Sequence, residues 1–105
     1  MSREEKLALI EDSASSILRG YIFCPNNAET WMTICANMEQ YFIPTFNEKI
    51  LLGDTFPDSF SVQCGLMTTM TAEDVLNNRI NVTLKVAVER PGEFEMITLS
   101  QVQLK

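Results

Sequence analysis

The chain has 105 residues, of which 46% are hydrophobic and 21% are charged, a balance typical of one small globular domain spanning residues 1–105. Its net charge of −6, with the basic residues scattered, argues against a nucleic-acid partner, because binding phosphates requires a basic surface. No apolar stretch approaches the ~20 residues that span a bilayer, so we expect no membrane partner.

A helix is predicted near the N-terminus. Ser2 and Glu5 have the spacing of a capping box, in which each side chain accepts a hydrogen bond from the other residue's backbone amide. Apolar residues then recur at three- and four-residue steps on one face: Leu7, Ile10, Ala14 and Ile17. Gly20 follows Arg19 as a stop signal. Residues 21–24 are aromatic and apolar, which predicts a buried strand or an extended segment.

A second helix is predicted over residues 28–42. Asn26 has a side chain suited to capping it, and Glu29 suits its first turn. Its apolar stripe consists of Trp31, Ile34, Cys35, Met38, Tyr41 and Phe42. Its polar side carries Glu29, Thr33, Asn37 and Gln40. Pro44 is expected to end or kink the helix, because proline lacks the amide donor and its ring clashes with the preceding turn.

The second half of the chain has the pattern of strands joined by turns. Residues 60–64 alternate apolar and polar side chains, as a half-buried strand does. Thr71 is expected to cap one short helical turn. Residues 80–88 form the clearest strand, and Pro91 with Gly92 marks a turn after it. These patterns predict an α+β fold, a small mixed or antiparallel sheet backed by two main helices, with an extended C-terminal strand.

The C-terminal segment changes the phase of its apolar pattern twice. The apolar pairs are Phe94 with Met96, Ile97 with Leu99, and Val102 with Leu104. Because strand side chains alternate between faces, each shift implies a bulge, a twist or a change of neighbour. Two interpretations stay open: a bulged edge strand, or an arm that leaves its own domain and pairs elsewhere. Phe94 and Trp31 are expected to be core residues.

The residue types that usually carry catalysis are missing. The chain has no histidine, the commonest general base and metal ligand. Cys24, Cys35 and Cys64 are widely spaced, which predicts buried thiols and neither a disulfide framework nor a zinc site. The four glycines are isolated, so no glycine-rich loop can cradle a phosphate. We therefore expect no enzymatic activity, no catalytic or metal-binding residue and no cofactor.

Several short motifs occur in a characteristic order. They are YIFCPNN at residues 21–27 followed by Thr30 and Trp31, FSVQC at residues 60–64, TAEDV at residues 71–75, Asn78 with Arg79, and AVERPGEF at residues 87–94. In order and spacing, over nearly the whole chain, these motifs resemble the C-terminal domain of contractile phage tail sheath proteins. The chain departs from the family's pattern at Cys24, Asn78, Val88 and Gly92.

The resemblance implies a domain that lies against an inner tail tube and builds a sheet shared with strands from neighbouring subunits. The residues that would face the tube protein are Glu29, Thr33, Asn37 and Gln40. The residues of the inter-subunit strand would be Ile97, Leu99, Gln101, Val102 and Leu104. The expected partners are neighbouring sheath subunits, the inner tube protein and baseplate wedge proteins, in a sixfold ring. The expected location is the virion tail, after assembly in the host cytoplasm, since the chain does not open with a signal-peptide pattern.

The place within the sheath is predicted from where the resemblance starts. It begins at residue 1, without the arm that precedes the domain in sheath proteins, which predicts a sheath initiator or terminator. Two alternatives stay open. One is a main sheath subunit encoded in pieces, and the other is an unrelated α+β adaptor that binds a partner peptide at its edge strand. Copy number per particle separates the first of these from an initiator.

Overall fold

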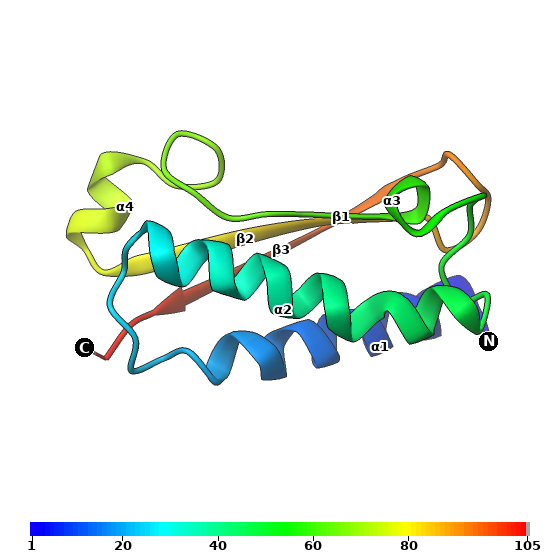
Figure 1. The fold of residues 1–105 in the computed structure, drawn as a ribbon, viewed down its shortest axis with the longest axis horizontal. Helices are drawn as coiled ribbons and strands as arrows, with labels where there is room; N and C mark the ends of the chain where they lie inside the picture. The colour runs from blue at the N-terminus through cyan, green and yellow to red at the C-terminus, as the bar shows by residue number, and fades with distance from the viewer. Residues whose placement is uncertain (105) are drawn as a thin grey trace.

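The structure is a computed structural model that describes residues 1–104. Its elements are α1 (Arg3–Arg19), α2 (Ala28–Asn47), α3 (Phe56–Ser59), β1 (Phe60–Gln63), α4 (Ala72–Leu76), β2 (Arg79–Val86) and β3 (Glu95–Val102). Figure 1 shows two layers, with α1 and α2 together on one side of the sheet. The predicted α+β fold is confirmed. Within the described residues, none of the helices has the length and apolar character needed to cross a membrane.

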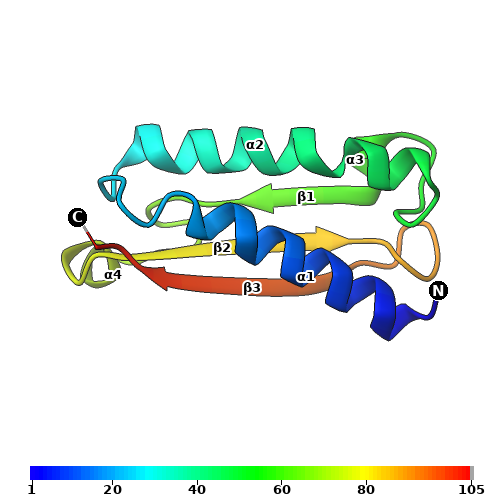
Figure 2. The same ribbon diagram turned by 90° about the horizontal axis from the view of Figure 1, so that it is seen from below.

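The three strands lie in the order β1-β2-β3, and both pairings are antiparallel (Figure 2). β2 pairs with β3 over the whole length of both strands, from Arg79 opposite Val102 to Val86 opposite Glu95. β1 is shorter and faces only the second half of β2. β2 is therefore the central strand, and β1 and β3 are the two edges of the sheet.

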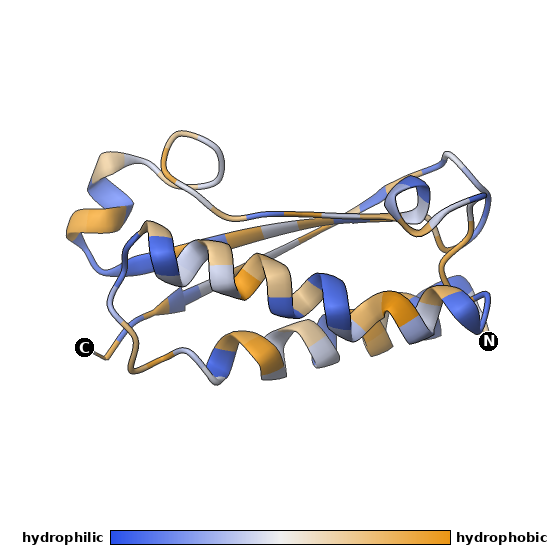
Figure 3. Ribbon diagram, in the orientation of Figure 1, coloured by the Kyte–Doolittle hydropathy of each residue, from blue (hydrophilic) through white to orange (hydrophobic). Residues whose placement is uncertain are grey.

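The core lies between the sheet and the two long helices. Every second residue of β2 is buried, and Figure 3 shows hydrophobic and hydrophilic residues alternating along that strand. The largest contributions to the core come from Ile10, Leu18, Trp31, Ile34, Met38, Phe42, Phe60, Ile80, Val82, Leu84, Val86, Ile97 and Leu99. Full burial of one such side chain contributes about 1.5–3 kcal/mol, so this layer is the main source of stability.

The ends of α1 and α4 are capped as the sequence predicts. Ser2 and Glu5 form the predicted capping box at the start of α1. Thr71 and Asp74 form a second capping box at α4. Capping is a local interaction between residues three apart, which is why sequence spacing predicts it.

The cap of α2 differs from the prediction. Asn27, and not Asn26, accepts the hydrogen bond from the amide of Thr30. Asn26 instead accepts a hydrogen bond from Nε1 of Trp31, at 2.6 Å, and donates one to the backbone carbonyl of Arg79, at 3.0 Å. The two asparagines are equally good caps, so contacts with β2 and α2 decide between them.

Pro44 does not end α2, which continues to Asn47. Proline removes one hydrogen bond from the helix, but the last turn is held by packing, because Phe46 contacts Phe56 edge-on with ring centroids 6.2 Å apart. Residues 21–24 form turns and not the predicted strand. Their carbonyl groups instead accept hydrogen bonds from the C-terminal end of the chain, as described below.

Candidate functional site

The outer edge of β3 carries backbone groups that no strand of this domain pairs. The amide of Gln103 donates to the carbonyl of Asn78, at 2.8 Å, which identifies these two residues as a hydrogen-bonded pair of the ladder. Hydrogen-bonded and non-bonded pairs alternate in an antiparallel ladder. The backbone groups that point away from β2 therefore belong to Met96, Thr98, Ser100 and Val102. Within residues 1–104, no hydrogen bond reaches these outward groups.

A second contact supports this assignment of which backbone groups of β3 point away from β2. Leu104 is the next residue in the same alternation, and its amide donates to the carbonyl of Ile22 at 2.8 Å. The turn after α1 therefore occupies the outer edge of the strand where the ladder ends. From Met96 to Val102 the edge is open.

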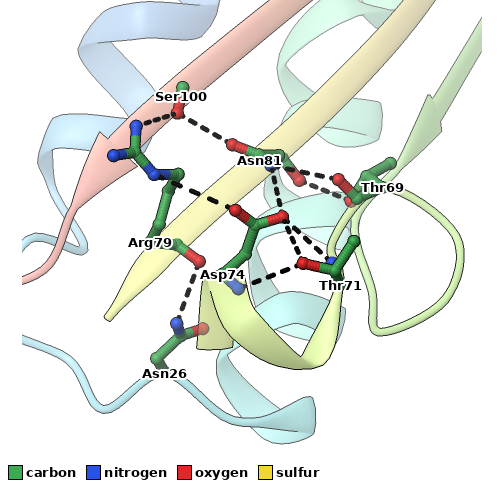
Figure 4. Close-up of polar contacts among 7 residues, drawn as sticks. All are labelled: Asn26, Thr69, Thr71, Asp74, Arg79, Asn81 and Ser100. Carbon is green, nitrogen blue, oxygen red and sulfur yellow. Dashed lines mark hydrogen bonds and ion pairs between the residues drawn. The ribbon is translucent and has the colours of Figure 1, made fainter. Parts of the chain in front are cut away.

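The open edge of β3 contrasts with the protected side of β2, shown in Figure 4. Beyond the end of β1, the carbonyl groups of Arg79 and Asn81 have no strand partner on that side. Oγ1 of Thr69 donates to the carbonyl of Asn81 at 2.6 Å, and Asn26 donates to that of Arg79. Side chains thus satisfy the free acceptors of the central strand, whereas the edge of β3 has no such cover.

The carboxylate of Asp74 holds α4 against the sheet (Figure 4). It accepts hydrogen bonds from the amide and hydroxyl of Thr71 and from Nδ2 of Asn81, and its second oxygen lies 4.0 Å from Nε of Arg79. Oγ of Ser100 donates to Oδ1 of Asn81 at 2.8 Å, which joins β3 to the same network. These side chains bond to one another across α4, β2 and β3, so we assign this cluster a structural role.

β3 is fixed to α1 at both of its ends. At its start, Glu95 forms an ion pair with Arg3, with Nη2 and Oε2 2.8 Å apart, and this hydrogen-bonded partner lowers the pKa of the Glu95 carboxyl group. At its end, Nε2 of Gln101 donates to the carbonyl of Leu18 at 2.9 Å. The buried Gln103 donates to the carbonyls of Tyr21 and Cys24.

These contacts confirm that the C-terminal segment is an edge strand, but they contradict the predicted bulge and the alternative of an arm. Its register with β2 is continuous, so β3 has no bulge, and its whole length pairs inside the domain, so it is not an arm. The inward positions after Leu99 are Gln101 and Gln103, whose amides bind backbone carbonyls in place of apolar contacts. Val102 and Leu104 remain on the outward side, which explains the apparent change of phase.

The predicted inter-subunit residues divide between the two sides of β3. Ile97 and Leu99 are 8% and 7% exposed and lie in the domain's own core, and Gln101 is bonded to α1. Val102 and Leu104 are 49% and 64% exposed. An external strand could therefore reach the backbone edge and the outward side chains, but not the first three predicted residues.

The predicted tube-facing residues lie together on α2. All four are exposed and form one row along the helix: Glu29, Thr33, Asn37 and Gln40. The first two border a groove with Tyr21 and Cys24 of the turn after α1, and the last two border a mostly apolar groove with Ile17 and Tyr41. The row thus borders two grooves that share Tyr21 in their lining.

Several hydrophobic side chains are exposed although the sequence pattern placed them in the core or gave them no role at the surface. Tyr41 is 54% exposed and Phe94 is 49% exposed, although both were expected in the core. Met96 and Met32 are 64% and 72% exposed. Trp31 is buried, as predicted. The period of a strand or helix shows which residues share a face, and only the packing of other elements decides which face is covered.

The cysteines are free thiols, half-buried where full burial was predicted. Burial raises the pKa of Cys64 to about 12 and also raises that of Cys35. Both groups are therefore neutral near pH 7, where the thiolate needed for nucleophilic chemistry is scarce. No set of three or more histidine, cysteine or acidic side chains placed to hold a metal ion exists within residues 1–104.

Comparison with known proteins relates this chain to others by fold. No protein-family model matches the chain, and no curated protein matches it. Among solved structures, its fold is similar to that of a chain in the cryo-EM structure of the anti-feeding prophage baseplate, sixfold symmetrised. The similarity has a TM-score of 0.72 at 22% sequence identity and covers 89% of this chain. It covers 26% of that chain, so the present fold corresponds to about a quarter of a longer protein.

Proposed function

We propose that this chain is a non-catalytic structural component of a contractile phage tail or a related contractile injection particle. In this proposal it joins neighbouring subunits by strand addition at the outer edge of β3. The observation that carries the proposal is an unpaired, uncharged strand edge on a fold shared with a chain of a sixfold-symmetrised baseplate. The sequence motifs that resemble tail sheath proteins support the same conclusion.

The chemistry of the edge suits a strand supplied by another subunit. Each outward amide and carbonyl from Met96 to Val102 can bond to an incoming strand, and each such bond contributes about 0.5–1.5 kcal/mol net. Because β2, the Arg3–Glu95 ion pair and Gln103 hold β3 in place, the edge is ordered before a partner arrives. Binding then costs little conformational entropy on this side of the interface.

The second surface in the proposal is the row on α2, which would face the inner tube protein. A contractile sheath moves relative to its tube, so these contacts must break while contacts between subunits persist. Exposed polar side chains such as Asn37 and Gln40 form weak contacts in water, whereas a paired strand is held by several backbone hydrogen bonds at once. The two surfaces therefore have the contrast in strength that contraction requires.

Within the particle, we propose a position at the end of the sheath next to the baseplate, as a sheath initiator that forms one sixfold ring. The baseplate origin of the structural neighbour favours this end over the far end. The partners would be neighbouring sheath subunits, the tube protein and baseplate wedge proteins, with assembly in the host cytoplasm.

Thr98→Pro tests the edge without breaking the domain. The amide of Thr98 points away from β2, and its exposed side chain makes no hydrogen bond within the described residues, so proline removes one outward donor and leaves the β2–β3 ladder intact. We expect the variant to fold, as judged by circular dichroism, and its incorporation into purified particles to fall about tenfold, for a loss of about 1.4 kcal/mol.

The matched control is Thr98→Val, which keeps the amide and a β-branched side chain and should be incorporated normally. Normal incorporation of a folded Thr98→Pro protein would contradict strand addition at this edge. Deleting the strand is a poorer test, because Ile97 and Leu99 belong to the core and the domain would unfold.

A further inference from the structure

The outward side of β3 is symmetric about Leu99. Counting outward from this residue, the first pair of outward positions carries hydroxyl side chains, the second carries aliphatic side chains and the third carries large apolar side chains. These pairs are Thr98 and Ser100, Met96 and Val102, and Phe94 and Leu104. The four apolar residues of these pairs are all exposed, with Phe94 at 49%, Met96 at 64%, Val102 at 49% and Leu104 at 64%.

We propose that this symmetry serves a second copy of the same chain, and that two copies pair through antiparallel β3 edges into one continuous six-stranded sheet. A twofold axis through Leu99 places Met96 of each copy opposite Val102 of the other, and Thr98 opposite Ser100. All four residues direct their backbone groups outward, so each of these pairs is a hydrogen-bonded pair of the new ladder.

Each cross-strand pair in this register is chemically matched. Two aliphatic side chains meet at Met96 and Val102, and two hydroxyl groups meet at Thr98 and Ser100, both of which are favourable neighbours on a sheet. Residues 96–104 contain no charge, so no like charges are opposed. Natural edge strands usually carry lysine, proline or a bulge that prevents such pairing, and this one carries none of them between residues 96 and 102.

The proposed ladder between the two copies also ends where the structure leaves the edge of β3 no longer open. The turn whose Ile22 carbonyl accepts a hydrogen bond from the amide of Leu104 occupies the edge just beyond Val102, where the twofold ladder ends. The dimer depends only on this edge and not on the proposed function. Since one edge pairs with one strand, the dimer and any strand-addition complex at β3 exclude each other.

A charge reversal tests the register. The purified wild-type chain at about 100 μM is expected to show twice its 11.9 kDa mass in light scattering coupled to gel filtration. Met96→Lys with Val102→Lys opposes two lysines at two places and should weaken dimerisation at least about tenfold. Met96→Lys with Val102→Glu also places charged side chains at both positions but opposes lysine to glutamate, and dimerisation should return. Both side chains are exposed, so the folded monomer tolerates either change.

Disulfide trapping with oxidised glutathione gives a second, independent readout. In the proposed register, residue 96 lies about 5.5 Å from residue 102 of the other copy between Cα atoms, within disulfide range. Two copies of residue 96 lie about 20 Å apart, beyond that range. An equimolar mixture of Met96→Cys and Val102→Cys should therefore form a covalent dimer, and each variant alone should not. The three native cysteines are present in every sample and serve as an internal control.

The outcomes separate this inference from the proposed function. A monomeric wild-type chain, equal behaviour of the two charge variants, or equal crosslinking of the mixture and the single variants would each overturn the β3 dimer. None of these results changes the expected incorporation of the chain into particles. Conversely, a chain that dimerises in the predicted register but never enters a particle would contradict the proposed function alone.

Discussion

Phe42→Ala is expected to lower the free energy of unfolding by about 3–5 kcal/mol, because it leaves a cavity at the centre of the core. Phe42 is 1% exposed, and its ring centroid lies 5.1 Å from that of Phe60, which stacks in turn on Phe56 at 5.2 Å. These rings join α2, α3 and β1, so the cavity weakens three elements at once. Since a small domain is stable by only about 5–15 kcal/mol, this one variant removes a large part of the total.

The measurement for Phe42→Ala is a urea titration followed by circular dichroism, with thermal melting as a check. The melting temperature should fall by more than about 12 °C, at 4–8 °C per kcal/mol for a domain near this size. Tyr41→Ala is the matched control, since Tyr41 is adjacent in sequence and touches Phe42 edge-on at 5.2 Å but is 54% exposed. It should cost about 1 kcal/mol or less. Equal losses for the two variants would contradict the placement of α2 on the sheet.

Gln103→Ala is expected to destabilise the domain by about 2–4 kcal/mol, although a glutamine near a C-terminus is usually an exposed residue. The side chain of Gln103 is 3% exposed and donates to the carbonyls of Tyr21 and Cys24, while its oxygen accepts from Gln101 at 2.8 Å. The substitution leaves the Cys24 carbonyl without this donor and leaves Gln101 without this acceptor.

The control for Gln103→Ala is Leu104→Ala, which removes a larger apolar side chain at the next position. Leu104 is 64% exposed and contributes its backbone amide, which alanine retains, so the change in stability should stay within about 0.5 kcal/mol. Hydrogen exchange at the amide of Leu104 gives a local readout, since the turn after α1 loses its attachment in Gln103→Ala. A larger loss for Leu104→Ala than for Gln103→Ala would mean that the strand end is held by apolar contacts.

The features predicted well from the sequence are those that depend on local spacing. The capping boxes at Ser2 and Thr71 involve residues three apart, and the alternation along β2 reflects burial of one sheet face. The wrong predictions concern residues whose contacts are made with a distant part of the chain. Asn26 was expected as the cap of α2, yet its side chain is recruited by Trp31 and by the carbonyl of Arg79, 53 residues away.

The candidate site could be predicted only in part for the same reason. The polar row on α2 follows from helical periodicity, and its members are indeed exposed together. The open edge of β3 does not follow from periodicity, because the direction of each amide depends on the register with β2. Gln101 was expected in the inter-subunit strand and Gln103 was given no role, whereas the inward side-chain amides of both satisfy carbonyls of residues 18–24. Their inward placement depends on contacts with α1 and the turn after it, which spacing along the sequence does not show.

The most direct test of the proposed function is the copy number of this chain in purified contractile particles, measured by quantitative mass spectrometry against the inner tube protein. We expect about one sixfold ring of this chain per particle. Parity with the tube protein would contradict the initiator role and favour a main sheath subunit encoded in pieces. Absence of the chain from the particles would contradict a structural role altogether and favour an adaptor that binds a partner peptide at its edge strand.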